Sequence, residues 1–268
     1  MFRRKKTDNF QIKIRFVNKE EYFNVTLIPL LNGKNEVYKI IGLTHNLTDH
    51  ILNEKNLKKL NSSLEKTIDA LATLEEYRDP YTAGHQRRVC DLAKTIAKTC
   101  GLDEQQVHWL RSASLLHDIG KNHVPSAILT KPTRLTPAEY EIIREHVESG
   151  YQILKIIDFP GNVAEIVYQH HEFIDGSGYP RGLKENEICI EAKILTVADI
   201  VEAMASHRPY RASRGIDVAL DQIRMWQGTK LDTKIVDTCI QVFNEGYQFI
   251  EYNKPLSQIV IEESLSRE

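Results

Sequence analysis

The sequence predicts a mainly α-helical protein with a small antiparallel β segment at its N-terminus and a helix that connects the two parts. Residues 10–47 are rich in β-branched and aromatic residues and contain the turn sequence Asn32-Gly33-Lys34-Asn35. From residue 79 onward, apolar residues recur at helical spacing in one segment after another. With 268 residues, 41% of them hydrophobic and 27% charged, the chain is long enough to bury a sizeable core.

In the β segment we expect strands at residues 11–17, 22–31 and 37–47, with the turn joining the last two. Three strands alone make a poor core, so the segment is interpreted as half of something larger. The ending from Ile41 to Asp49 resembles the last strand and exit of a PAS sensor domain. The helices that usually cover the ligand pocket of such a domain are missing, and we infer no bound sensor ligand.

The connecting helix is expected at residues 50–76 and is polar on its outside. Apolar positions alternate at spacings of three and four, which defines an a/d seam of about two and a half heptads. The seam consists of Leu57, Leu60, Leu64, Thr67, Leu71 and Leu74. A dimerising signalling helix is the first interpretation, and a helix packed on its own domain is the alternative.

The rest of the chain is predicted to be helical up to about residue 250. Val89, Leu92, Ala93, Ile96 and Ala97 form one apolar stripe, which Gly101 closes. Thr136-Pro137-Ala138-Glu139 is a capping box that opens a helix ending near residue 157. Other helices are expected at 105–116, 161–172, 188–206, 216–226 and 233–245, and a loop at 176–180.

Composition argues against several classes of protein. The net charge of −2 gives no basic field for nucleic-acid binding, and Arg3-Arg4-Lys5-Lys6 is interpreted as a solvated terminus. No apolar run is long enough to span a membrane, and the N-terminus lacks a hydrophobic signal core. The four cysteines are widely spaced, which favours free thiols in the reducing cytoplasm.

The residues that carry chemistry are histidines and aspartates on inward faces of the predicted helices. His117-Asp118 is followed three residues later by Lys121, which suits a divalent metal with a cation beside it. His146 shares the face of its helix with Ile142 and Ile143. A single histidine on an apolar face is usually a satisfied core residue. However, a core would be badly destabilised by this many unpaired polar groups, which also include His85, His170, His171 and Asp199.

Imidazole and carboxylate ligands without thiolate suit iron, manganese, zinc or similar ions. Seven ligands exceed the needs of one tetrahedral site and suit two metals that share a bridging carboxylate, for which Asp118 is the natural choice. Two-metal sites typically activate a hydroxide and stabilise the oxygens of an in-line phosphoryl displacement. The residues therefore indicate phosphoester hydrolysis.

The chain also resembles the HD-GYP domains, a subset of the HD metal-dependent phosphohydrolases, over roughly residues 75–250. The matching stretches follow the order of that family, and together they are highly specific. They are 79–85, His117-Asp118-Ile119-Gly120-Lys121, His146, 170–180, Val197-Ala198-Asp199 and Arg208-Pro209-Tyr210-Arg211.

The resemblance implies an HD-type helical bundle that hydrolyses cyclic di-GMP to the linear dinucleotide pGpG, and in some members to GMP. It implies that His85, His117, Asp118 and Asp199 hold one metal, and that Asp118, His146, His170 and His171 hold the other. The catalytic residues would be Asp118 and Lys121. Lys121 would meet the scissile phosphate, as charge stabiliser or as proton donor to the leaving oxygen.

Further residues are implied to contact substrate. The loop with Gly178, Tyr179 and Pro180, together with Arg181, would border the substrate. Arg208 and Arg211 could pair with phosphates or stack on guanine, although an anchoring role for Arg208 is nearly as well supported. Some members hold a third metal with a glutamate at the position of Tyr81, so this chain favours a two-metal site.

These observations predict four parts: a PAS-like segment at 1–49, a signalling helix at 50–76, a catalytic domain at 77–250 and a tail at 251–268. We expect two divalent ions, iron or manganese first, with zinc, magnesium, nickel and cobalt as alternatives. Expected partners are cyclic di-GMP, a second copy of the chain through the 50–76 helix, and diguanylate cyclase or sensor proteins. The alternatives are hydrolysis of another cyclic dinucleotide, such as cyclic GMP-AMP, and a non-catalytic sensing or scaffold module.

Overall fold

The computed structural model describes residues 6–17, 19–78, 84–131, 133–206 and 215–250, and for residues 77 and 78 the backbone alone. The chain forms two compact units, residues 1–66 and residues 67–268. The division falls within helix α1 (Thr48–Arg78), so the boundaries expected near residues 49 and 76 stay predictions. The tail at 251–268, Tyr81, Arg208 and Arg211 lie outside the described residues.

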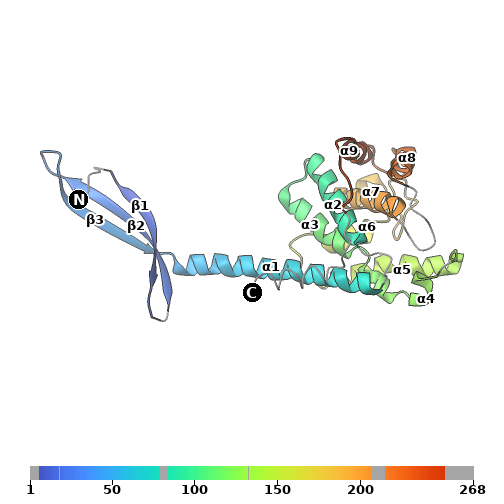
Figure 1. The fold of residues 1–268 in the computed structure, drawn as a ribbon, viewed down its shortest axis with the longest axis horizontal. Helices are drawn as coiled ribbons and strands as arrows, with labels where there is room; N and C mark the ends of the chain where they lie inside the picture. Colours follow the sequence, from blue (N-terminus) through green and yellow to red (C-terminus); the bar gives the residue numbers. More distant parts are fainter. Residues whose placement is uncertain (1–5, 18, 79–83, 132, 207–214, 251–268) are drawn as a thin grey trace. The chain divides into compact units, whose positions relative to one another are not determined.

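The N-terminal unit contains an antiparallel sheet in the order β1-β2-β3, which confirms the three predicted strands (Figure 1). The strands are β1 (Asp8–Arg15), β2 (Glu20–Leu31) and β3 (Val37–Asn46). Among the described residues of this unit, Val25 is the one buried apolar side chain. The sheet therefore has almost no core of its own, as expected for three isolated strands.

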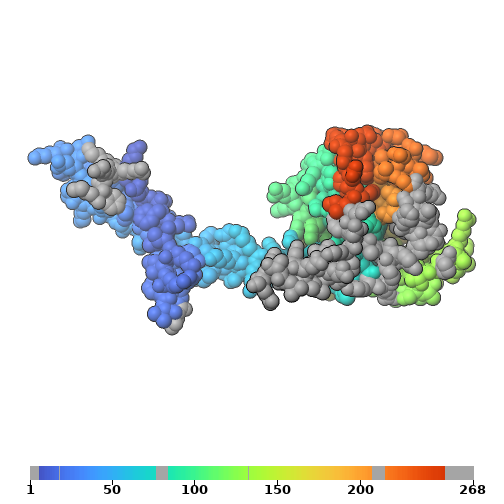
Figure 2. Space-filling model, in the orientation of Figure 1, coloured from blue at the N-terminus to red at the C-terminus, as the bar shows by residue number. Residues whose placement is uncertain are grey.

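The second unit is a bundle of helices, which confirms the predicted fold class (Figure 1). Its described α-helices after α1 are α2 (His85–Thr99), α3 (Glu104–Leu116), α4 (Ser126–Leu129), α5 (Pro137–Leu154), α6 (Val163–Gln169), α7 (Ile190–Ala205), α8 (Ile216–Trp226) and α9 (Thr233–Asn244). Short 3₁₀ helices form at η2 (Ile119–His123) and η3 (Glu185–Glu187). Helix α2 packs on α3 and α7, and α5 packs on α6 and η2. In the space-filling view, α8 and α9 adjoin each other on one side of this unit (Figure 2).

The ends of the helices follow from local chemistry. The Thr136 hydroxyl accepts a hydrogen bond from the backbone N–H of Glu139, so the predicted capping box is confirmed. Gly101 closes α2 with φ of 84°, a left-handed conformation that glycine adopts without a side-chain clash. Three helices are shorter than expected by more than one residue: α5 ends at Leu154, α6 covers only Val163–Gln169, and α7 covers Ile190–Ala205. Helix α6 ends early because His170 Nδ1 and the N–H of Glu172 bind carbonyls of its last turn.

Helix α1 is exposed over most of its length and packs on the helical unit only toward its C-terminal end. Near its C-terminal end, Ile68 and Ala72 are buried in the core of the helical unit, and Asp69 forms an ion pair with Arg111 at 3.0 Å. In the predicted seam, Leu57, Leu60, Leu64 and Leu74 are exposed, whereas Leu71 is partly buried against the core of the helical unit. The end of α1 therefore packs on its own unit, and a dimerising role for the exposed leucines stays a prediction.

Two further sequence predictions concern the environment of the chain. Cys90, Cys100, Cys189 and Cys239 are all free, and Cys90 and Cys239 are buried. Among the described residues, no helix has both the length and the apolar character that crossing a membrane requires.

Candidate metal centre

The seven predicted ligands are histidines and aspartates, and separate helices bring six of them to one place, with Asp118 considered below. His85 is the first residue of α2, His117 follows the last residue of α3, and His146 lies within α5. His170 and His171 come directly after α6, and Asp199 lies in α7. Because each residue sits on the inward side or at the inner end of its helix, the bundle collects all of them in its interior.

These six residues form two separate groups of three. His85, His117 and Asp199 make one group, and His146, His170 and His171 make the other. Within each group, one nitrogen or oxygen from every residue lies within 4.8 Å of the others. In the first group, His85 Nε2 is 3.3 Å and His117 Nε2 is 3.9 Å from Asp199 Oδ1. Each group thus offers three ligands to one ion.

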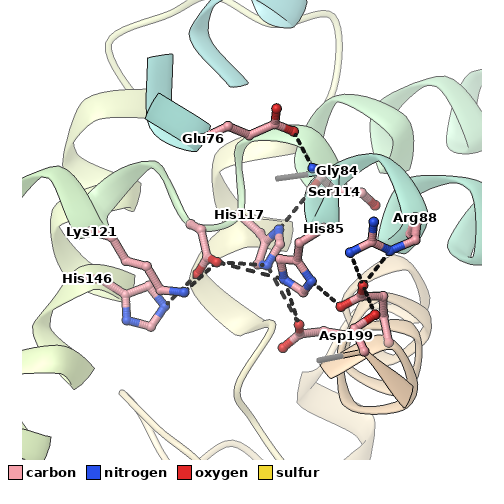
Figure 3. Close-up of polar contacts among 12 residues, drawn as sticks. Glu76, Gly84, His85, Arg88, Ser114, His117, Lys121, His146 and Asp199 are labelled. Atoms are coloured by element: carbon pink, nitrogen blue, oxygen red, sulfur yellow. Dashed lines mark hydrogen bonds and ion pairs between the residues drawn. The ribbon is translucent and has the colours of Figure 1, made fainter. Parts of the chain in front are cut away.

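The seventh residue, Asp118, lies between the two groups. Its Oδ2 is 3.5 Å from His117 Nε2 and 3.9 Å from His85 Nε2, whereas its Oδ1 is 3.6 Å from His146 Nε2. Each carboxylate oxygen therefore faces a different group. The contacts of the Asp118 carboxylate, drawn as dashed lines in Figure 3, run toward His146 and Lys121 on one side and toward His85 and His117 on the other. Lys121 Nζ donates to Oδ2 at 2.5 Å, which puts a cation at the edge of the centre.

The orientation of the histidines fits metal binding. His117, His146 and His170 each place Nδ1 against the backbone carbonyl three residues earlier, at 2.8, 2.7 and 2.5 Å. A proton on Nδ1 leaves Nε2 with its lone pair, which is the ligand form of imidazole. The Nε2 atoms of these three residues are buried and have no hydrogen-bond partner in the part of the chain that the structure describes. Buried nitrogens of this kind are costly unless an ion binds them, so the residues present fit a metal.

His85 is held differently. Its Nδ1 contacts the buried carboxylate of Glu202, which also accepts hydrogen bonds from Arg88 Nε at 2.7 Å and from the Ser206 hydroxyl at 2.6 Å (Figure 3). A carboxylate behind a ligand histidine fixes its ring and increases its basicity. Glu76 holds the start of the same helix by accepting the N–H of Gly84 at 3.1 Å.

Burial and neighbouring charges set the protonation of the two groups differently. Burial lowers the pKa of His146 to about 4 and, with help from His146, that of His171 to about 3. Both rings are thus neutral and ready to act as ligands. Burial also opposes a charge on His85, but Glu202 and Asp199 outweigh it and raise the pKa of His85 to about 9. The field that favours a proton on His85 would favour a metal cation at the same place.

Asp118, the candidate bridging residue, stays ionised. Burial by itself would raise the pKa of Asp118, but Lys121, followed by His117 and His146, outweighs it, and the pKa of this carboxyl lies well below its usual range. Asp118 is therefore an anion in a largely apolar interior, as a bridging ligand must be.

Gly120 allows the two halves of the centre to approach. A Cβ at this position would lie 1.9 Å from the carbonyl oxygen of His146 and 2.5 Å from the backbone nitrogen of Gly150. Helix η2, which follows Asp118 and carries Lys121, consequently packs directly on α5. Any side chain at residue 120 would separate Asp118 from His146.

The predicted substrate loop is attached to the second group. The Glu172 carboxylate accepts the N–H groups of Arg181 and Leu183 at 2.7 and 2.9 Å, and the N–H of Tyr179 binds the carbonyl of His171 at 3.1 Å. The Tyr179 ring stacks on the His171 ring, with centroids 4.8 Å apart. A Cβ at Gly178 would lie 2.4 Å from the nitrogen of Phe173, so glycine is required there.

The structure thus places Gly178, Tyr179 and Pro180 beside the candidate ligands. The side chain of Arg181 is already engaged, since it forms an ion pair with Glu165 and lies 4.7 Å from the centre of the Tyr168 ring.

Sequence reasoning missed the residues that hold the ligands in place. Glu202 and Arg88 each lie three residues after a predicted ligand, Asp199 and His85, so helical spacing could have indicated both. Glu172 was noted only as part of the motif. Glu75, which is buried near the end of α1, had no signal in the sequence.

Comparison with known proteins agrees with this geometry. The HD domain family matches residues 69–235, and the chain belongs to that family. It is 38% identical over 228 residues to a cyclic di-GMP phosphodiesterase of Thermotoga maritima, covering 76% of this chain and 62% of that protein. It is 41% identical over 157 residues to the 3′3′-cGAMP-specific phosphodiesterase 3 of Vibrio cholerae, covering 59% and 34%. The chain therefore spans less than two thirds of these relatives.

Among solved structures, an HDG"Y"P protein from Bdellovibrio bacteriovorus shares the fold. The TM-score is 0.50 at 21% identity, and the match covers 60% of this chain and 52% of that one.

Proposed function

We propose that the helical unit is a metal-dependent phosphodiesterase that hydrolyses cyclic di-GMP to linear pGpG, with GMP as a further product if pGpG is cut again. The observation that carries this proposal is the position of Asp118, whose two oxygens face two separate groups of three ligands. The relative from Thermotoga maritima that is named a cyclic di-GMP phosphodiesterase supports the choice of substrate.

The proposed ligands are His85, His117 and Asp199 for one ion and His146, His170 and His171 for the other, with Asp118 shared. Nitrogen and oxygen donors without thiolate favour iron or manganese, with zinc, magnesium, nickel and cobalt as alternatives. When bound, two divalent ions would supply an activated water and neutralise charge on the phosphate that it attacks.

Lys121 is the proposed catalytic side chain beside the ions. Its ammonium group donates to Asp118 at 2.5 Å, and its side chain is 19% exposed, so the ammonium would also meet a phosphate that enters the site. There it would either stabilise the developing charge or give a proton to the leaving 3′ oxygen. Tyr179, Gly178, Pro180 and Arg181 are proposed to border the substrate, and Arg208 and Arg211 to bind its phosphates or bases.

A second candidate substrate is cyclic GMP-AMP, because the relative from Vibrio cholerae that is named for that substrate is 41% identical over 157 residues. A scaffold without turnover is the candidate from a different class. The centre argues against it, since a scaffold has no need for two adjacent ligand groups with buried, unpartnered nitrogens.

The exposed leucines of the seam, Leu57, Leu60, Leu64 and Leu74, support a homodimer formed through α1. The N-terminal unit would then be part of a sensor that acts on the enzyme through α1, with diguanylate cyclases or other sensors as further partners. The four free thiols support a location in the cytoplasm.

The test is an anaerobic hydrolysis assay with iron- or manganese-loaded protein, in which cyclic di-GMP and cyclic GMP-AMP are compared and metal is counted per chain. We expect pGpG and about two metals per chain, as the two ligand groups imply. Asp118→Ala should lose both metals and all turnover. Near-normal turnover by that variant would contradict the two-metal proposal, and an absence of metal in the unaltered protein would favour the scaffold.

A further inference from the structure

His171 differs from the other candidate histidine ligands in what holds its ring. The Nδ1 atoms of His117, His146 and His170 bind backbone carbonyls, and that of His85 contacts Glu202. Within the described part of the chain, the His171 ring has ring contacts and no such hydrogen bond. Its orientation must therefore come from packing.

The main packing partner of His171 that is not itself a candidate ligand is Tyr179. The two rings stack with an interplanar angle of 28°. Tyr179 is half-buried. Its backbone is held by His171 itself, through the carbonyl that accepts its N–H at 3.1 Å. These contacts fix where the Tyr179 backbone lies, but they do not fix the plane of its ring.

Arg144 supplies the remaining contact. Its guanidinium carbon lies 4.2 Å from the centre of the Tyr179 ring and 5.9 Å from that of Tyr140. One of its terminal nitrogens forms an ion pair with Glu141 at 3.0 Å, while its Nε is buried with no partner among the described residues. A planar guanidinium on an aromatic face holds that face in place in a way that a flexible ammonium does not.

We propose that Arg144 is a positioning residue for His171 and acts through the ring of Tyr179. Arg144 sets the plane of Tyr179, and the stacked Tyr179 sets the plane of His171, so that the imidazole lone pair points to the place shared with His146 and His170. The inference rests on the proposed metal centre and adds to it a residue that lies outside the ligand set.

The first test measures metal affinity by competition with a coloured chelator, and no turnover is needed. Arg144→Met removes the planar cation and keeps a flexible side chain of similar reach. We expect this variant to lower the affinity for the ion at the His146, His170 and His171 group by about 10-fold, which is the low end for losing a group that orients a ligand. Tyr179→Leu should do the same, whereas Tyr179→Phe should keep the affinity because the ring, and not the hydroxyl, makes the stack.

Arg224→Met is the matched control. Arg224 also forms an ion pair with an acid three residues earlier, Asp221, at 3.2 Å, and it makes no ring contact among the described residues. An Arg144→Met variant that binds metal as tightly as Arg224→Met would overturn the inference.

A double-mutant cycle separates positioning from general destabilisation. If Arg144 acts only through His171, Arg144→Met should cause no further loss of metal affinity in a His171→Ala background. A full additional loss of metal affinity in the His171→Ala background would overturn the inference, even if the Arg144→Met single variant also binds metal weakly. If the unaltered protein binds two metals and Arg144→Met has no effect, only this inference fails. If it binds none, the proposed function fails as well.

Discussion

Glu202 gives the sharpest test of how the centre is built. Its carboxylate is 1% exposed and binds His85, Arg88 and Ser206. Replacing it with alanine would remove one buried anionic partner from His85 and from Arg88, which are 4% and 17% exposed. His85 would keep Asp199, whose Oδ1 lies 3.3 Å from its Nε2. The burial raises the cost of this loss, because little water can replace the carboxylate.

The expected magnitude follows from these contacts. Removing one partner of a buried charge pair costs about 3–5 kcal/mol. Arg88 keeps some access to water, so we expect Glu202→Ala to cost about 3 kcal/mol. At 1.4 kcal/mol per factor of ten, this raises the unfolded fraction by roughly two orders of magnitude. Since Glu202 also orients His85, metal affinity should fall by about 10- to 100-fold.

The assay is urea denaturation of metal-free protein, followed by tryptophan fluorescence. Both tryptophans, Trp109 and Trp226, lie in the helical unit, so the signal reports on the unit that contains Glu202. Asp221→Asn is the control, because Asp221 makes one ion pair and its side chain is 71% exposed. We expect that control to stay within about 0.5 kcal/mol. A Glu202→Ala protein that unfolds like the control would refute the reasoning.

Three other predictions concern the same centre. Lys121→Ala should keep both metals and lower kcat by about 100-fold or more; loss of metal in elemental analysis would mean that Lys121 is structural. Gly120→Ala should destabilise the unit and weaken metal binding, because its Cβ would meet the His146 carbonyl at 1.9 Å; unchanged urea and metal titrations would contradict the close packing. Metal-free protein should lose stability as the pH falls from about 6.5 toward 4. The pKa of His146 is depressed to about 4 in the folded protein, so the unfolded state takes up a proton at a higher pH than the folded state does. This uptake lowers the free energy of unfolding by on the order of 3 kcal/mol. Urea midpoints that do not change over this pH range would contradict the prediction.

Local patterns explain which elements could be predicted. The capping box at Thr136 and the left-handed Gly101 are decided by neighbouring residues, so the start of α5 and the end of α2 follow from sequence. The early end of α6 does not, because it depends on carbonyls captured by His170 and Glu172. The short helix η2 was missed because its packing on α5 depends on contacts with a distant segment.

The sequence by itself determined the mainly helical fold and the polar residues that had to converge inside it. Periodicity placed His146 and Asp199 on buried faces, and the order of motifs indicated the HD family, because both are properties of short segments. The family resemblance also implied the division of the ligands into two groups that share Asp118. Only the tertiary structure gave the distances that turn one Asp118 oxygen toward each group. The same holds for the supporting contacts of Glu202 and Arg144, which join residues from different helices and loops and so depend on how those elements pack.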